Sequence, residues 1–233
     1  MGKRQDARDR VERRIVELGR ARLVTDGAAG LSLRAIARDL GMVSSAVYRY
    51  VASRDELLTL LLVDAYTELA DSVEQARDAA AGGWRQQLAA MARAAREWAV
   101  QRPAVWALLY GSPVPGYRAP RDETVGPGTR VVGALLEVVA AGVAAGDIPP
   151  SGNAAPQPLS KDFDGLREEF GVAVDDAVMV RSMVLWAALV GAISLEVFGQ
   201  YGPDTFAEPS VLFDMQVVLL TDLLGRHAPG QNS

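Results

Sequence analysis

The chain of 233 residues contains no cysteine and only one histidine, His227. The lack of cysteine excludes disulfides, thiolate catalysis and zinc sites built on cysteine. A single histidine cannot form an imidazole cluster, so we expect neither a metal site of that kind nor Ser-His or Cys-His catalysis. The sequence also shows no phosphate-binding glycine loop. These shortages predict a protein that is not an enzyme and that needs no cofactor or metal.

Long apolar runs are missing as well. The most apolar stretch, residues 183–197, contains Glu196 and is shorter than the ~20 residues that a membrane span needs. The first residues are charged rather than apolar, which is unlike a secretory signal. We therefore expect a cytoplasmic protein without a membrane partner.

The charges are unevenly distributed along the chain. The net charge is −5, but residues 1–60 carry 12 Lys and Arg against 8 Asp and Glu, whereas the remaining residues carry 12 against 21. A basic module attached to an acidic body is typical of DNA-binding proteins. An ordinary solvated basic helix would give the same count, so charge alone leaves both interpretations open.

Apolar residues recur at helical spacing along most of the chain, and no strand pattern or repeat stands out. We predict an all-α fold of about nine helices. Two segments rich in Pro and Gly, 112–128 and 147–174, are predicted to be loops. The second is expected to be flexible, with room for a helical turn over residues 163–170. Residues Ser53 to Glu56 form a capping box that opens a long fourth helix. The predicted helices are a first one ending near Asp26-Gly27, then 33–40, 44–50, about 54–80, 84–101, 103–110, 131–145, 175–199 and 210–226.

Residues 31–51 have the pattern of two short helices joined by a tight turn. Gly41 supplies the positive φ that such a turn requires, and Val47 is placed to plug the second helix into the first. A hairpin buried in a core would have no need for hydroxyls, phenols and a guanidinium on its outer face, whereas these groups reach base edges and phosphates in a major groove. The apolar face of the first helix comprises Leu33, Ile36, Ala37 and Leu40. The second helix exposes Ser44, Ser45, Tyr48, Arg49 and Tyr50.

The segment from about residue 14 to residue 62 resembles the tetracycline-repressor (TetR) family of bacterial regulators. A weaker similarity, from Trp186 to Gly199, resembles a signature of the dimerising region in actinobacterial members. Two positions depart from the family pattern. Val43 stands where a Ser or Thr cap is usual, so Ser44 is expected to cap the recognition helix instead, and Arg54 replaces the usual lysine. The matching residues are Ile15, Gly27, 33–37, Leu40-Gly41, 46–50 and 53–58.

The resemblance implies a three-helix helix-turn-helix domain, residues 1–53, joined through the long fourth helix to a helical ligand-binding and dimerisation domain, residues 54–228. Tyr48 and Tyr50 are expected to contact phosphates or a thymine methyl. Ser44, Ser45 and Arg49 are expected at base edges or phosphates. Arg34 and Arg54 are expected to hold the DNA backbone from helix N-termini.

The last two helices are apolar over more than the single stripe that a surface helix needs. They can serve a dimer interface, or they can simply cover their own core. The resemblance favours an isologous four-helix interface between two copies of the chain. The residues predicted for it are Trp186, Leu189, Ile193, Leu212, Met215 and Leu219.

The resemblance also implies a small-molecule pocket in the body of the protein. Aromatic residues at helical spacing are often core residues, but an aromatic-rich helical cavity would suit an apolar or aromatic effector. The candidate lining residues are Met91, Trp98, Trp106, Tyr110 and Trp186.

Together these features predict a transcriptional regulator without a cofactor. Its partners would be a double-stranded DNA operator, a second copy of the chain and an unknown small-molecule effector. Repression of a palindromic operator, relieved by the effector, is the leading hypothesis. A ligand-independent DNA-binding dimer and a helical protein-interaction module remain the alternatives.

Overall fold

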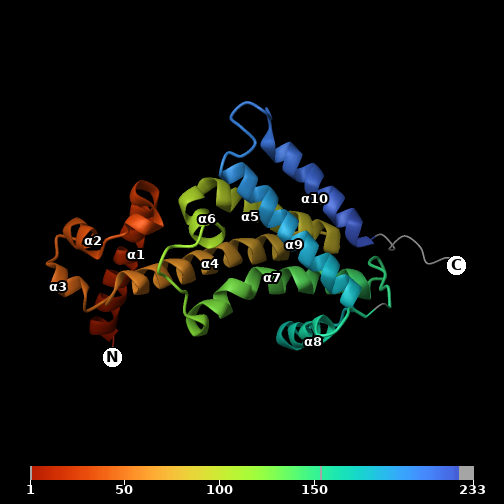
Figure 1. Ribbon diagram of the computed structural model, residues 1–233, viewed down its shortest axis with the longest axis horizontal. Coiled ribbons are helices and arrows are strands. Elements are labelled where there is room, and N and C mark those ends of the chain that lie inside the picture. The colour runs from red at the N-terminus through yellow and green to blue at the C-terminus, as the bar shows by residue number, and fades with distance from the viewer. Residues whose placement is uncertain (1, 153, 226–233) are drawn as a thin grey trace. The chain divides into compact units, whose positions relative to one another are not determined.

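A computed structural model describes residues 2–152 and 154–225, with the side chains of residues 2–4 also outside the description (Figure 1). Within this part of the chain the regular structure is entirely helical, which confirms the predicted fold class. The chain forms two compact units: an N-terminal unit, Met1–Glu68 with Arg102–Gly128, and a C-terminal unit, Leu69–Gln101 with Thr129–Ser233. The helices are α1 (Gly2–Gly30), α2 (Leu33–Asp39), α3 (Ser44–Val47), α4 (Arg54–Ala79), α5 (Trp84–Gln101), α6 (Pro103–Tyr110), α7 (Arg121–Ala144), α8 (Leu159–Phe170), α9 (Asp176–Val197) and α10 (Pro209–Gly225).

Glycine and hydroxyl side chains set the boundaries of the N-terminal helices. Gly27 interrupts α1 with φ 66°, and Gly41 has the same φ in the turn between α2 and α3. Both residues therefore occupy the left-handed region that favours glycine. At the start of α4, the Ser53 hydroxyl accepts a hydrogen bond from the Glu56 N–H at 3.0 Å, and the Glu56 carboxylate accepts from the Ala52 N–H at 2.5 Å. The Ser53 half of the predicted capping box is thus confirmed, whereas Glu56 reaches back to the residue before Ser53 rather than to Ser53 itself.

Helix α7 begins ten residues earlier than the sequence predicted. The segment 112–128 was expected to be loop because it is rich in Pro and Gly, yet α7 starts at Arg121 and contains Pro127. Asp122 and Glu123 lie in its first turn, where negative charge is favourable. The proline removes one intrahelical hydrogen bond without ending the helix.

The segment 147–174, expected to be a flexible loop, contains the twelve-residue helix α8. Phe163 on this helix is buried, and Gly171 ends it in the left-handed conformation with φ 64°. The structure therefore differs from the expectation of a flexible loop, since the helical turn allowed over residues 163–170 is part of a longer helix. The Pro-rich start of the segment concealed one amphipathic stripe, which is short but sufficient to hold a helix.

Two adjacent carboxylates fasten this segment to the start of α9. Asp175 is the N-cap of α9 and accepts a hydrogen bond from the Val178 N–H at 2.8 Å. It also accepts bonds from the Ser151 N–H at 2.7 Å and the Gly152 N–H at 3.1 Å. Burial acts to raise the pKa of Asp175, but these backbone donors outweigh it and hold the pKa below its ordinary value.

Asp176 makes the second part of this fastening. Its carboxylate pairs with the Arg167 guanidinium of α8 and accepts a hydrogen bond from the Ala155 N–H at 2.7 Å. The bond from Arg167 is the main reason that the pKa of Asp176 falls to about 2, with the Ala155 N–H and the Ser160 hydroxyl adding to it.

We expect the stability of the protein to fall as pH drops from about 4 to about 2. A carboxylate with a lowered pKa in the folded state stabilises the fold above its ordinary pKa, and it loses that contribution as it is protonated. Asp176→Asn should lower the melting temperature at pH 6 and flatten the decline between pH 4 and 2. Thermal unfolding across this range is the measurement. Asp164→Asn removes a second, mostly exposed partner of Arg167 and is the matched control. Equal slopes for wild type and Asp176→Asn would contradict the assignment.

Candidate DNA-binding site

A core of aliphatic side chains positions the helix-turn-helix within the N-terminal unit. Ile36 of α2 and Val47 of α3 are fully buried, as the apolar spacing predicted. Leu40 is only half-buried and packs at the edge of this core. Because the apolar side chains fill the inner face, the polar side chains of α2 and α3 are left facing solvent. The core also contains Ile15, Leu23, Leu31, Leu33, Ala37, Val51, Leu57, Leu58 and Leu61.

The recognition helix begins at Ser44, with Val43 as its N-cap. The expectation that Ser44 caps the helix is therefore wrong, and no side chain caps α3 at all. Val43 has an extended backbone, φ −69° and ψ 142°. The N–H groups of Tyr48 and Tyr50 bond to the carbonyls of Ser44 and Val47 at 3.1 and 2.9 Å, so the chain continues to turn beyond the helix. The predicted reading face thus spans one helical turn and the turn that follows it.

Four of the predicted DNA-binding side chains are exposed on this module. Ser45 and Arg49 are exposed, and so is Tyr48, whereas Ser44 is half-buried. Arg34 is exposed at the second position of α2. Hydroxyls, a phenol and two guanidiniums are thereby offered to solvent by α2, α3 and the turn after it, a set suited to base edges and phosphates.

The cations on this module differ in whether the chain neutralises them. Arg34, Arg38 and Arg49 are exposed and form no ion pair with any residue in the described ranges. Arg22 of α1, by contrast, grips Asp39 with two guanidinium nitrogens, at 3.0 Å from Nε and 2.8 Å from Nη2. Unpaired guanidiniums are the groups that neutralise DNA phosphates. Arg38 was missed in the sequence, although its place four residues after Arg34 puts both on neighbouring helical turns.

Tyr50 is less available than the sequence predicted. Its ring is half-buried against the core of the module, and the guanidinium carbon of Arg8 lies 5.9 Å from the ring centroid. A cation over an aromatic face is attracted to it. Tyr50 therefore links α1 to the recognition segment, and its predicted contact with DNA stays a prediction.

Arg54, predicted to hold a phosphate, has partners within the chain. Its guanidinium donates to the carbonyl oxygens of Ala28 and Ala29 at 2.8 and 3.2 Å. These carbonyls belong to the last residues of α1, where helix carbonyls lack intrahelical donors. Arg54 thus bonds the first turn of α4 to the end of α1.

This arrangement predicts that Arg54→Ala lowers the free energy of unfolding by about 1.5–3 kcal/mol, the typical worth of hydrogen bonds to a charged group. The salt dependence of DNA binding should stay unchanged, because a lost phosphate contact would reduce the slope by about 1 for each protomer. Arg34→Ala is the control. It should reduce the salt dependence of DNA binding and leave the free energy of unfolding unchanged. Denaturant unfolding and DNA titrations at several salt concentrations separate the two roles. A reduced salt slope with unchanged stability in Arg54→Ala would restore the phosphate assignment.

The residues predicted for a dimer interface divide into two groups. Leu189 and Ile193 of α9 are 6% and 2% exposed, so they belong to the core of the C-terminal unit. Met215 and Leu219 of α10 are 63% and 56% exposed. Trp186 and Leu212 are half-buried. The prediction stays untested, but its exposed members all lie on α10.

Other exposed apolar side chains extend this surface, which we call the α9–α10 face. Helices α9 and α10 pack side by side in the C-terminal unit (Figure 1). On each helix the exposed apolar residues recur at helical spacing, which makes one continuous stripe per helix. The α9–α10 face consists of Val180, Val184, Ala187 and Leu195 on α9 and Val211, Met215, Val218, Leu219 and Leu223 on α10.

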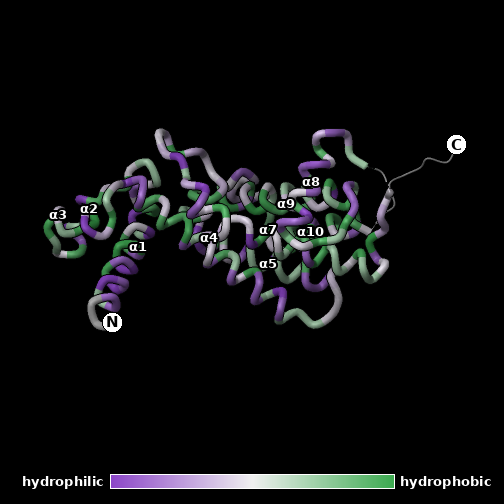
Figure 2. Tube along the Cα trace, turned by 90° about the horizontal axis from the view of Figure 1, so that it is seen from below, coloured by the Kyte–Doolittle hydropathy of each residue, from purple (hydrophilic) through white to green (hydrophobic). Residues whose placement is uncertain are grey.

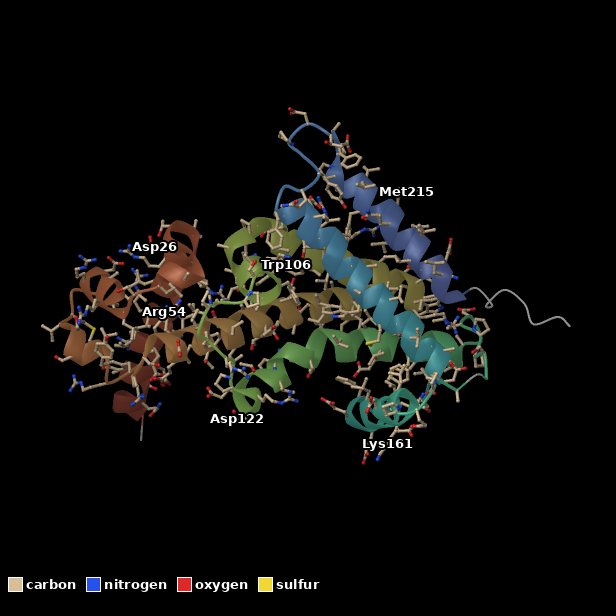
Figure 3. The ribbon with its side chains drawn as sticks, viewed as in Figure 1. Asp26, Arg54, Trp106, Asp122, Lys161 and Met215 are labelled. Atoms are coloured by element: carbon tan, nitrogen blue, oxygen red, sulfur yellow. The ribbon has the colours of Figure 1, made fainter. Side chains whose placement is uncertain are left out.

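The predicted pocket residues are spread over both units. In the N-terminal unit, Trp106 is buried and its ring centroid lies 4.3 Å from that of Tyr110 (Figure 3). Tyr66 meets Tyr110 edge to face at 6.4 Å, and burial raises the pKa of both phenols, Tyr110 the more strongly. In the C-terminal unit, Met91 and Trp98 are buried and Trp186 is half-buried. Trp106 and Tyr110 are thus in contact, and the lining of a ligand pocket stays a prediction.

Comparison with known proteins gives this arrangement a family. Residues 88–220 match the family model described as Tetracyclin repressor-like, C-terminal domain. The HTH-type transcriptional regulator Rv1816 of Mycobacterium tuberculosis is 62% identical over 228 residues, covering 97% of each chain. The HTH-type transcriptional repressor DrrR1 of Streptomyces coeruleorubidus is 39% identical over 85 residues, covering 36% of this chain and 28% of that protein.

A solved structure agrees with these matches over the whole chain. The putative regulatory protein SCO4313 is 33% identical, with a TM-score of 0.76 over 96% of this chain and 100% of that chain. The similarity therefore includes the helix-turn-helix as well as the C-terminal helices. The chain belongs to the tetracycline-repressor family of DNA-binding helix-turn-helix transcriptional regulators, and it is not an enzyme.

Proposed function

We propose that the protein is a cytoplasmic repressor that binds a palindromic operator as a homodimer and is released by a small-molecule effector. The observation that carries this proposal is that one chain has two distinct surfaces, one suited to DNA and one suited to association. One is the set of unneutralised guanidiniums on α2 and in the turn after α3, and the other is the α9–α10 face. The partial relative from Streptomyces coeruleorubidus is named a repressor, which supports repression as the output.

The size of the reading face supports binding as a dimer. A segment of seven residues, Ser44 to Tyr50, spans only a few base pairs of the major groove. Two copies related by a twofold axis read a palindrome whose half-sites lie about 34–36 Å apart. An isologous interface supplies this symmetry, because the same patch on each copy meets its equivalent.

The α9–α10 face has the chemistry of such an interface. Exposed apolar stripes of this length are uncommon on monomers and mark association surfaces. Val180, Val184 and Leu223 also border a groove of about 210 Å³ on these two helices, lined by apolar side chains and Arg181. Side chains of a second copy would fill it, and the apolar area removed from water would stabilise the dimer.

Gly191 in the middle of α9 supports the same interface. A Cβ atom built on this residue would meet nothing within 4 Å in the chain itself, so packing within the protomer does not require glycine. Glycine inside a helix is also unfavourable by about 1 kcal/mol relative to alanine. Gly191 follows Val184 and Ala187 along the exposed stripe at helical spacing. Glycine has no side chain, so at this position it would allow α9 of a second copy to approach closely.

The aromatic residues support an apolar or aromatic effector. Tyr66, Trp106 and Tyr110 gather in the N-terminal unit, and burial raises the pKa of the two tyrosine phenols further above neutral pH. Flat apolar rings with a few hydroxyl donors are typical of small-molecule sites. Thermal-shift screening against apolar and aromatic compounds should find ligands that raise the melting temperature and release DNA. Ligands that raise it without releasing DNA would favour a ligand-independent regulator.

Selection of bound sequences from a random DNA pool, using the full chain, tests the core of the proposal. We expect an enriched palindrome whose half-site centres are about one helical turn apart. In gel shifts on the enriched sequence, the affinity for DNA should fall steeply as the salt concentration rises, since the arginines of the protein neutralise DNA phosphates and release their counterions. Enrichment of a single unpaired half-site would contradict the dimer. No enrichment at all would favour a helical protein-interaction module.

A further inference from the structure

Val43 is an apolar side chain in an unusual position. It is 71% exposed although it lies between Gly41 and the recognition helix, next to the buried Val47 core. Val43 and Tyr48 are the exposed large hydrophobic side chains of residues 31–51, a segment that the structure describes in full. A continued helix would place Val43 one turn before Val47, on the same inner face. The extended backbone at Val43 breaks that spacing, and the side chain lies outside the core.

A residue at this position ordinarily caps the helix or packs in the core, and neither role explains a valine here. The N-cap position favours Ser, Thr, Asp or Asn, whose oxygens accept a backbone N–H of the first turn. Val43 has no such oxygen, and α3 has no side-chain cap. Its side chain also contributes little to the core of the module, because most of it is in contact with solvent. An exposed β-branched apolar residue remains on the segment that carries Ser45, Tyr48 and Arg49.

We propose that Val43 contacts the C5-methyl group of a thymine in the major groove and so selects thymine at one position of each half-site. The proposal rests on the proposed function, since it needs a specific operator. Among the base edges of the major groove, the thymine methyl is the apolar feature, and apolar side chains contact it. The occupant is inferred from continuity: Val43 directly precedes Ser44 and Ser45, and the DNA that reaches Ser45 and Arg49 covers their exposed neighbour.

Replacing thymine by deoxyuridine tests the contact, because it removes the methyl group and keeps every hydrogen bond of the base pair. The full chain is titrated with the selected operator and with operators in which one symmetry-related pair of thymines is replaced. For one such pair, wild type should bind the operator with deoxyuridine (the uridine operator) about 15-fold more weakly than the operator with thymine. One buried methyl group is worth about fourfold in affinity, and the dimer loses one at each half-site.

Val43→Ser should bind thymine and uridine operators equally at that pair, and Val43→Ala, which keeps a single methyl group, should discriminate between them less than wild type. The serine variant also supplies a capping hydroxyl, so that loss of discrimination is separated from loss of the helix. Val24→Ala is the matched control, since Val24 is also an apolar residue, 72% exposed, but lies on α1 outside the helix-turn-helix. It should keep the full discrimination of wild type.

Two results would overturn the proposal. One is a thymine preference that persists undiminished in both Val43 variants. The other is a wild-type protein that tolerates uridine at every thymine of its operator. In both cases the protein would still bind a selected palindrome, so the proposed function would stand. Failure of wild type to select any DNA would remove the proposed function and this contact together.

Discussion

Met215→Glu combined with Leu219→Glu is expected to yield a monomer at micromolar concentration that binds the operator at least 100-fold more weakly. Both side chains lie on the α9–α10 face and are more than half exposed in the protomer. Met215 is labelled on α10 in Figure 3. Burying an apolar side chain of this size stabilises an interface by about 1.5–3 kcal/mol, and an isologous interface loses each contact twice. An unpaired buried carboxylate adds a further penalty. A loss of about 3 kcal/mol already corresponds to 100-fold.

Sedimentation and DNA titration measure the two effects. The fold of each protomer should survive, because the changed side chains are exposed and outside the core, so helical circular dichroism should match wild type. Leu159→Glu is the matched control: Leu159 is an exposed leucine of the same unit, on α8 rather than on the α9–α10 face. A double variant that remains dimeric while the control is also dimeric would place the interface elsewhere.

Gly191→Leu tests the same interface by adding a side chain where two α9 helices are proposed to approach closely. Leucine is about 1 kcal/mol more favourable than glycine inside a helix, and a Cβ atom at this position meets nothing within 4 Å in the chain itself. The protomer should therefore become no less stable, whereas the dimer should dissociate more readily because two α9 helices can no longer approach closely. Dimerisation stronger than in wild type would contradict the close approach at Gly191.

The second large effect is expected for Tyr48→Ala combined with Arg49→Ala, which should weaken operator binding at least 30-fold. A bidentate contact between Arg49 and guanine is worth about 1–3 kcal/mol, and a dimer makes it twice. Removing the exposed phenol of Tyr48 adds the loss of a phosphate or methyl contact. Arg49→Ala alone should also relax the preference at one base pair of each half-site, which selection from random DNA can read out.

A matched control separates base recognition from charge. Arg118 is an exposed arginine of the same unit that lies in the loop before α7, outside the helix-turn-helix. Arg118→Ala removes the same charge and should leave the preferred sequence unchanged. An operator-binding curve identical to wild type for the Tyr48 and Arg49 double variant would remove both residues from the reading face.

The sequence predicted best those features that depend on neighbouring residues. The capping box at Ser53 and the glycine turns at Gly27 and Gly41 are local, because each is decided within a few residues of the chain. The core positions Ile36 of α2 and Val47 of α3 also followed from the spacing of apolar residues along these short helices. For the same reason the module that carries the predicted DNA-binding side chains could be located from the sequence.

Features that depend on distant partners were harder to predict. Arg54 resembles a free cation in the sequence, and only the fold brings it to the carbonyls of Ala28 and Ala29. Helix α9 is apolar on most sides, so periodicity did not tell that Leu189 faces the protomer's own core while Val184 faces outward. Hydrophilic residues dominate the start of α1 (Figure 2). This hydrophilic pattern predicts an exposed helix end, but it could not show that Arg8 lies over the ring of Tyr50.

In the proposed dimer, the α9–α10 face makes operator binding depend on the abundance of the regulator. Association that stabilises the folded state acts by mass action, so the melting temperature of a dimerising chain should rise with protein concentration. Below the dissociation constant of that dimer, occupancy of a palindrome would grow with the square of the protomer concentration. A modest change in expression would then produce a disproportionate change in the fraction of operators bound, and the apolar stripe of α10 would set the concentration below which that sensitivity applies.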